Sequence, residues 1–183
     1  WMIGETLVAG IGQGYFLATP AQLSLATAQL VNGGKKISSK IIYKDNDLPD
    51  QNKSIKNLAD TKHLEFLKDC LFAATNEQGG TSYRSRLTGK YQFAGKTGTS
   101  QVRRISEKER EEGIIKNKDL EWGQRDHGIF IGYGPINKPK FSISVLIEHG
   151  GSGSGAAAPI AKKVMNFIFK HKIDIKRIVI TDA

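Results

Sequence analysis

The sequence has one cysteine, Cys70, in 183 residues. A single cysteine excludes an internal disulfide framework and a CxxC metal site, and its helical surroundings predict packing in the core. No segment approaches the ~20 apolar residues of a membrane span, and no signal peptide is visible. The chain opens abruptly, with Trp1 before Met2, so we expect it to be a piece of a longer protein.

The charge balance is basic, with a formal net charge of +9. The basic residues alternate with acidic ones and are not interleaved with aromatic residues, which does not favour a nucleic-acid interface. No pattern of His, Cys, Asp and Glu supports a metal site, so we predict neither metal nor cofactor. The composition indicates an ordinary basic globular domain.

Two helices and a short strand are predicted in the first half of the chain. The prediction places a glycine-rich loop up to Thr19, a helix from Pro20 to Gly33-Gly34, a strand over 37–43 and a helix over 58–75. Thr19 is a good N-cap, Pro20 suits the first helical position, and Gln22 completes a capping box.

The second half is rich in strands. Segments 129–133 and 141–147 alternate apolar residues, and the short link between them predicts an antiparallel hairpin. Residues 103–126 carry many charges of both signs, which is typical of a solvated excursion. After a glycine turn, a final helix is predicted to face inward with Ile160, Val164, Phe167 and Ile168. The whole pattern predicts an α+β fold, with at least three antiparallel strands and helices packed against them.

The segment "YQFAGKTGTSQV", residues 91–102, has the composition of an anion-binding strand. Gly95 and Gly98 would let another chain or a ligand approach the backbone closely. Lys96, Thr97 and Thr99 offer an ammonium and two hydroxyls, which hold carboxylates or phosphates.

Three glycine motifs invite a nucleotide-binding interpretation. "GIGQGY" lacks the third small residue of GxGxxG, and "GKYQFAGKT" has the wrong spacing for a P-loop. "GSGSGA", residues 151–156, matches GxGxxA and precedes a helix, with Asp182 after a later apolar run. Its preceding strand belongs to a hairpin rather than to a parallel sheet, so this interpretation is the weaker one.

Five segments in this order resemble the C-terminal part of the transpeptidase domain of class B penicillin-binding proteins of the elongation type. They are "WMIGETLVAGIGQGYFLATPAQL", "GGTSYR", "AGKTGTSQV", "RDHGIFIGYGP" and "EHGGSGSGAAAPIA". The resemblance implies the penicillin-binding/β-lactamase-like transpeptidase fold, with residues 1–183 forming the C-terminal portion of one domain. That portion would hold three of the family's five antiparallel strands and lack the N-terminal strands and the nucleophile helix.

The resemblance implies a peptidoglycan D,D-transpeptidase that cross-links stem peptides by serine acyl transfer. Lys96 would lie near the substrate's terminal carboxylate and assist proton movement to the leaving D-alanine. Thr99, expected on the same strand face as Lys96, would bind the carboxylate and supply an oxyanion-hole N–H. Gly98 would leave room for the substrate to lie antiparallel to the strand. Thr97, expected on the opposite face, would act as a structural or indirect member of the substrate site.

One departure from the family concerns the nucleophile. The family uses an SxxK serine and an SxN motif, but no serine here has a lysine three residues later or an asparagine two residues later. We therefore expect this chain alone to be inactive and soluble, and either to self-associate or to have a disordered N-terminal segment through about residue 16. By resemblance, the intact protein would be anchored in the bacterial inner membrane and face the periplasm. It would bind stem peptides and β-lactams beside a membrane glycosyltransferase.

Two further points stay open at the level of sequence. The chain could instead be a non-catalytic peptide-binding or scaffold module that adds a peptide strand to its sheet edge. His127 in "RDHG" could act as a base, but a structural role with Arg125 and Asp126 is favoured, and His149 is expected to be exposed or to cap the following turn.

Overall fold

The computed structural model describes residues 1–37, 39 and 59–173. The strand predicted over 37–43 falls almost entirely outside the described residues, as does Asp182. The α-helices are α1 Ile3–Gly10, α2 Pro20–Val31, α3 Thr61–Asn76, α4 Glu107–Glu112 and α5 Ala158–Lys170. The strands are β1 Ala94–Ser100, β2 His127–Gly134 and β3 Phe141–Ile147.

The three strands form one antiparallel sheet in the order β1-β2-β3. The predicted hairpin is confirmed, with Gly134 opposite Phe141 and Gly128 opposite Ile147. β1 pairs with β2 without interruption, from Ala94 opposite Tyr133 to Ser100 opposite His127. The predicted α+β class is therefore confirmed, and the sheet leaves β1 and β3 as its edge strands within the described residues.

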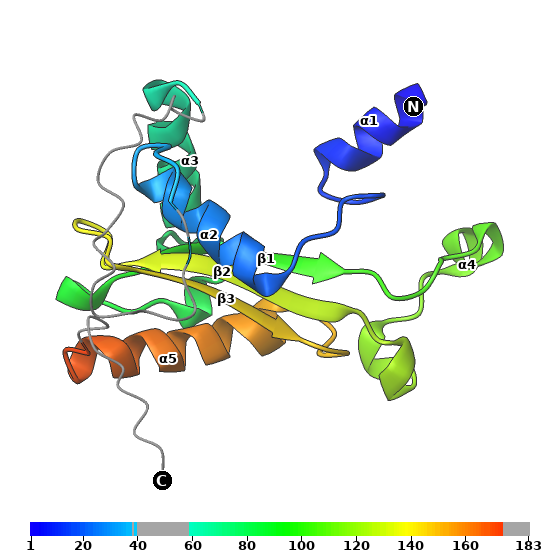
Figure 1. The fold of residues 1–183 in the computed structure, drawn as a ribbon. Helices are drawn as coiled ribbons and strands as arrows, with labels where there is room; N and C mark the ends of the chain where they lie inside the picture. Colours follow the sequence, from blue (N-terminus) through cyan, green and yellow to red (C-terminus); the bar gives the residue numbers. More distant parts are fainter. Residues whose placement is uncertain (38, 40–58, 174–183) are drawn as a thin grey trace, which may run out of the picture.

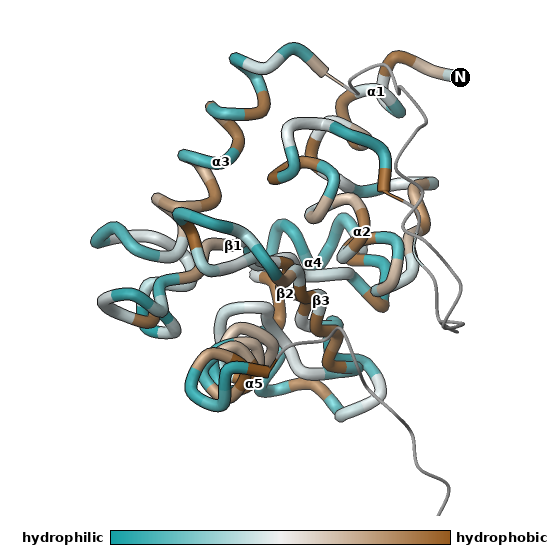
Figure 2. The backbone as a smooth tube through the Cα atoms, turned by 60° about the vertical axis from the view of Figure 1, so that its left-hand side comes forward, coloured by the Kyte–Doolittle hydropathy of each residue, from teal (hydrophilic) through white to brown (hydrophobic). Residues whose placement is uncertain are grey.

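Helices cover both faces of the sheet (Figure 1). α5 packs against one face, and α2 and α3 lie over the other. The hydrophobic residues of β2 and β3 lie between these layers, as the brown tube in Figure 2 shows. The main core forms on the α5 side, where burial of apolar surface stabilises the fold. It contains Phe93, Phe130, Ala157, Ala158, Ala161, Met165 and Phe169.

The inward face of α5 differs from the predicted one. Ala158, Ala161, Met165 and Phe169 are buried, and Ile160, Val164 and Phe167 are 40%, 40% and 56% exposed. The small side chains at 158 and 161 allow the helix to approach the sheet closely, so they take the inner face although they are less apolar than isoleucine. Of the predicted set, only Ile168 is correct, because it is half-buried against the core.

The segment predicted as a loop before Thr19 contains helix α1. Its sequence has no proline, and Glu5 lies in the first turn, where a carboxylate interacts favourably with the helix dipole. The helix ends before Gly12 and Gly14, which both have positive φ. None of its residues is buried, and it projects away from the sheet in Figure 1.

The two predicted helices of the first half are present. α2 begins at Pro20 with the predicted capping box of Thr19 and Gln22, and α3 starts three residues later than predicted, at Thr61. Cys70 is exposed, so its predicted core position is wrong. In the described ranges, no helix combines the length and apolarity that a bilayer span requires.

Candidate active site

The register of β1 determines which of its side chains share a face. Lys96 lies opposite Ile131, Thr97 opposite Phe130 and Thr99 opposite Gly128, in an unbroken ladder. Successive side chains of a strand alternate between faces, so Thr97 and Thr99 lie on one face and Lys96 on the other. The prediction that Thr99 shares a face with Lys96 is therefore wrong, because the two residues are an odd number of positions apart. Thr97 and Thr99 are the two residues of this group whose side chains share a face.

The backbone groups of Thr97 and Thr99 point away from β2. The N–H of Gly95 donates to Thr75 Oγ1 at 3.0 Å, and Thr75 Oγ1 lies 3.0 Å from the Gly95 carbonyl oxygen. Gly95 therefore directs both groups outward. In an antiparallel pair this direction recurs at every second residue, so the N–H and C=O groups of Thr97 and Thr99 also point away from β2. No strand among the described residues pairs with this outer edge of β1.

Lys96 is exposed and bends toward the same edge. Its ammonium donates to the carbonyl oxygen of Thr97 at 2.9 Å. The side chain starts on the face that α2 and α3 cover, and there it borders a cavity of about 440 Å³ between these helices. The remainder of the cavity wall is almost entirely apolar and includes Leu23, Leu30, Leu71 and Ile131. A positive charge therefore lies between an apolar cavity and an open strand edge.

Thr97 contacts a residue that the sequence did not identify as part of the site. Its hydroxyl donates to Thr81 Oγ1 at 2.9 Å, and Thr81 is exposed. Thr81 lies in the turn after α3, within the "GGTSYR" segment that supported the family resemblance. Nothing in the local pattern around Thr81 indicated this contact, because the two residues meet only when α3 packs against β1.

The two glycines of the strand have different surroundings. A Cβ added at Gly95 would overlap the Ile131 carbonyl oxygen and the Phe130 ring, whereas one at Gly98 would lie 3.5 Å from Ile129 Cβ. The close approach predicted at Gly95 is therefore made by the protein's own strand and core, not by a ligand. Gly98 has ordinary van der Waals room on its face.

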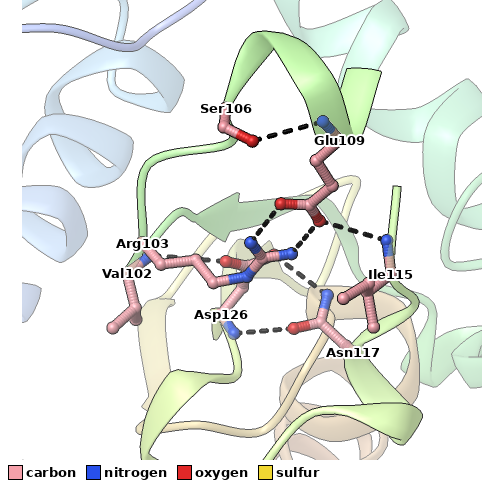
Figure 3. Close-up of polar contacts among 7 residues, drawn as sticks. All are labelled: Val102, Arg103, Ser106, Glu109, Ile115, Asn117 and Asp126. Atoms are coloured by element: carbon pink, nitrogen blue, oxygen red, sulfur yellow. Dashed lines mark hydrogen bonds and ion pairs between the residues drawn. The ribbon is translucent and has the colours of Figure 1, made fainter. Parts of the chain in front are cut away.

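The charged excursion between β1 and β2 is largely exposed, as predicted, and its polar side chains form defined contacts (Figure 3). It contains α4, and the Arg103 guanidinium forms a two-pronged ion pair with Glu109. The hydrogen bond from Arg103 lowers the pKa of the Glu109 carboxyl from 4.5 to about 2. Glu109 also accepts from the N–H of Ile115 at 3.2 Å, which fixes the return of the chain after α4.

Asp126 ties the far end of this excursion to the end of β1. One carboxylate oxygen accepts from the N–H of Val102 at 3.3 Å, and the other accepts from the Asn117 amide at 2.9 Å (Figure 3). The Asp126 N–H in turn donates to the Asn117 side-chain oxygen at 2.8 Å. The segment that follows Thr99 is therefore held in place by side chains of the excursion.

His127 and His149 form a structural contact at the start of β2. The N–H of His149 donates to His127 Nδ1 at 2.9 Å, and His149 Nδ1 lies 3.0 Å from the Arg125 carbonyl oxygen. This contact supports the favoured structural role of His127. His149 is half-buried rather than exposed, and the Trp122 ring lies against it at an angle of 58°, with the ring centroids 4.4 Å apart.

The glycines of "GSGSGA" serve packing. A Cβ at Gly153 would overlap backbone atoms of Gly98 and Ile129, so this turn lies directly on the sheet. The residues do not open a parallel βαβ unit, which removes the structural context of a dinucleotide motif. Among the described residues, no three His, Cys, Asp or Glu side chains gather to hold a metal ion.

Comparison with known proteins decides the family. Residues 1–166 match the model of the penicillin binding protein transpeptidase domain. The chain belongs to the penicillin-binding protein transpeptidase family. The predicted class B relationship is also confirmed, because curated relatives and solved structures of penicillin-binding protein 2 align with almost the whole chain.

Several curated relatives carry the name peptidoglycan D,D-transpeptidase MrdA, and two of them illustrate the similarity. The Haemophilus influenzae protein is 34% identical over 94% of this chain, and the Acinetobacter baumannii protein is 35% identical over 91%. The chain spans 27% and 25% of the length of these two relatives.

The solved structures that share the fold of this chain include two of PBP2. Pseudomonas aeruginosa PBP2 in complex with WCK 5153 has a TM-score of 0.72 and 34% identity, covering 91% of this chain and 34% of that one. Helicobacter pylori PBP2 in complex with MreC has a TM-score of 0.71 and 32% identity, covering 93% of this chain and 28% of that one. The predicted transpeptidase fold is thereby confirmed.

Proposed function

We propose that this chain is the C-terminal part of a peptidoglycan D,D-transpeptidase that cross-links stem peptides by serine acyl transfer. The observation that carries the proposal is the outer edge of β1. There the outward backbone groups of Thr97 and Thr99 lie beside the Lys96 ammonium and two threonine hydroxyls. An extended peptide with a terminal carboxylate matches such an edge in backbone pairing and in charge.

In this proposal the strand binds the acyl donor and stabilises the reaction. The outward N–H of Thr99 donates to the oxyanion that forms on the attacked carbonyl. The hydroxyl of Thr99 hydrogen-bonds the donor's terminal carboxylate, and Thr97, whose hydroxyl donates to Thr81, supports the site from the same face. Lys96 supplies a positive charge to the same carboxylate and favours proton transfer to the leaving D-alanine. Gly98 leaves space for the donor to lie antiparallel to β1.

In this proposal, the 183 residues supply the substrate-binding strand, and the nucleophile lies outside them, since no SxxK or SxN motif occurs in them. In the intact protein, an SxxK serine would attack the donor and form the acyl-enzyme. That protein would also bind β-lactams, and it would act at the periplasmic face of the inner membrane beside a glycosyltransferase. The MreC complex of the Helicobacter pylori relative suggests a comparable partner here.

Labelling with a fluorescent penicillin tests the proposal. The product of the complete reading frame should form a covalent adduct, and the 183-residue chain should form none because it lacks the activated serine. In the intact protein, Lys96→Ala should lower the acylation rate by roughly 10²–10³, as expected for loss of one electrostatic stabiliser.

The matched control is Lys138→Ala, an exposed lysine in the link between β2 and β3. Its acylation rate should stay at the wild-type value. An adduct on a serine of the isolated chain would contradict the assignment of the nucleophile. Wild-type acylation by the Lys96 variant would show that β1 does not bind the substrate.

A further inference from the structure

Side chains from the last turn of α3 occupy the first half of the outer edge of β1. Thr75 Oγ1 accepts from the Gly95 N–H and lies 3.0 Å from the Gly95 carbonyl oxygen. The Asn76 amide donates to the carbonyl oxygen of Phe93 at 3.0 Å. Two side chains thus take the positions that a neighbouring strand would take, at two successive outward-facing residues.

Thr75 is held firmly in this position. Its side chain is fully buried, and its hydroxyl lies 3.1 Å from Ser82 Oγ, which donates to the Ala74 carbonyl oxygen at 3.0 Å. Gly80 makes this arrangement possible, because a Cβ there would lie 2.5 Å from the Ala74 carbonyl oxygen. The turn after α3 therefore fixes the Thr75 hydroxyl against Gly95.

The same turn marks where the occupied part of the edge ends. Thr81 accepts a hydrogen bond from Thr97, the next outward-facing residue after Gly95. From Thr97 onward, no strand among the described residues pairs with the edge. α3 thus closes the edge at Phe93 and Gly95 but not at Thr97 and Thr99, where the Lys96 ammonium contacts the Thr97 carbonyl oxygen.

This boundary matters for the register of a bound peptide. A peptide antiparallel to β1 has its C-terminus directed toward Gly95. A slip by two residues would keep every side chain on the same face, so alternation between faces cannot prevent it. Closure of the edge at Gly95 does prevent it, because no backbone group remains there for a further peptide residue.

We propose that Thr75 and Asn76 are positioning residues for the acyl donor. Their side chains hydrogen-bond the outward backbone groups of Gly95 and Phe93, so a bound peptide strand can pair with β1 only from Thr97 onward. The site therefore binds the C-terminal end of a peptide in one register. This inference rests on the proposed function. The chemical class that fits is a short peptide with a free terminal carboxylate beside Lys96, rather than an internal segment of a longer chain.

The test uses the intact protein and two substitutions at one position. Thr75→Val keeps the shape of the side chain but removes the hydroxyl, which leaves both edge groups of Gly95 unpaired. Thr75→Ser keeps the hydroxyl. The measurement is the rate at which saturating fluorescent penicillin acylates the protein, divided by the concentration of active sites found by titration.

We expect Thr75→Val to slow acylation by about tenfold or more, since small misplacements of a catalytic strand have effects of that order. Thr75→Ser should restore the rate nearly to the wild-type value.

Ser24→Ala is the matched control. It removes the hydrogen bond between the hydroxyls of Ser24 on α2 and Ser142 on β3, whose oxygen atoms lie 2.9 Å apart. This contact lies at the edge of the sheet away from β1. This variant should lose thermal stability without losing acylation rate per active site. If Thr75→Val does not fold, Asn76→Ser, whose side chain is too short to reach Phe93, provides the second test with the same expected direction.

The outcomes separate the two proposals. A wild-type protein that penicillin does not label would overturn the proposed function itself. A labelled wild type whose Thr75 or Asn76 variant retains the full rate per active site would overturn the positioning role alone. Failure of Thr75→Ser to rescue the rate would also count against it, because the hydroxyl is the group that holds Gly95.

Discussion

Gly95 and Gly98 lie three residues apart on the same strand, yet an added methyl group would meet different surroundings at each. At Gly95 it would point into the core and overlap backbone and ring atoms. At Gly98 it would make an ordinary contact with Ile129 on the opposite face. The first glycine is therefore required by the fold, and the second is available for function.

Alanine substitutions at the two glycines should separate these requirements. Gly95→Ala should destabilise the chain by about 3 kcal/mol or more, because the core must shift to admit the methyl group. Gly98→Ala should leave thermal stability unchanged or slightly higher, since glycine weakens a strand interior by roughly 0.5–1 kcal/mol relative to alanine. Thermal unfolding followed by circular dichroism measures both effects.

In the intact protein, Gly98→Ala should also slow acylation by about tenfold or more if the donor lies against this position. A Gly98→Ala protein with normal acylation would remove Gly98 from the substrate site. A Gly95→Ala chain with normal stability would mean that the strand accommodates the methyl group by a backbone shift.

At the scale of elements, the excursion from Arg103 to Asp126 is attached to the sheet at both ends. Arg103 and Glu109 close its first half, and Asp126 with Asn117 secures the second half to Val102. These contacts involve charged groups, so the order of the excursion depends on their ionisation. The excursion follows Thr99 directly, and its order therefore bears on the end of the candidate site.

The ordering of the excursion should weaken in acid. The folded-state pKa of Glu109 is about 2 and its ordinary value is 4.5, so the unfolded segment binds more protons between these values. The stabilisation is fully present above pH 4.5 and is lost as the pH falls toward 2. The Ile115 N–H donates a hydrogen bond to Glu109, so its protection from hydrogen exchange should decline as the pH falls from 4.5 toward 2.

Glu109→Gln should lower that protection at neutral pH and remove its decline in acid. Glu111→Gln, an exposed acid in the same helix, is the control and should behave like the wild type. Unchanged Ile115 protection in Glu109→Gln would show that the ion pair does not order the excursion.

At the scale of the whole molecule, much apolar surface is uncovered. The segment from Trp1 to Leu17 exposes large side chains, with Leu7 at 71% and Leu17 at 94% exposure. The cavity between α2 and α3 is also lined mainly by apolar groups. Exposed apolar patches and open strand edges favour association between molecules.

The isolated chain should fold and self-associate. Light scattering at rising protein concentration should show a growing mean mass. A Leu7→Lys/Leu17→Lys variant should associate less at the same thermal stability, because both side chains make few contacts within the chain. A strictly monomeric wild-type chain would show that these apolar groups are not sufficient for association, and would favour a self-sufficient binding module.

The sequence by itself determined several of the local elements and the family. Capping residues at Thr19 and Gln22 placed α2, and alternating apolar residues placed the β2–β3 hairpin. These signals depend on neighbouring residues, so they can be read without the fold. The ordered motifs around "AGKTGTSQV" predicted the transpeptidase family before any contact was known.

Only the tertiary structure decided which faces and edges those elements use. α5 buries alanines rather than Ile160 and Val164, because close approach to the sheet favours small side chains. The contacts of Thr75 with Gly95 and of Thr81 with Thr97 join residues that are distant in sequence, and no local pattern encodes them. The open edge at Thr97 and Thr99 exists because α3 covers the edge only as far as Gly95, and packing alone decides that boundary.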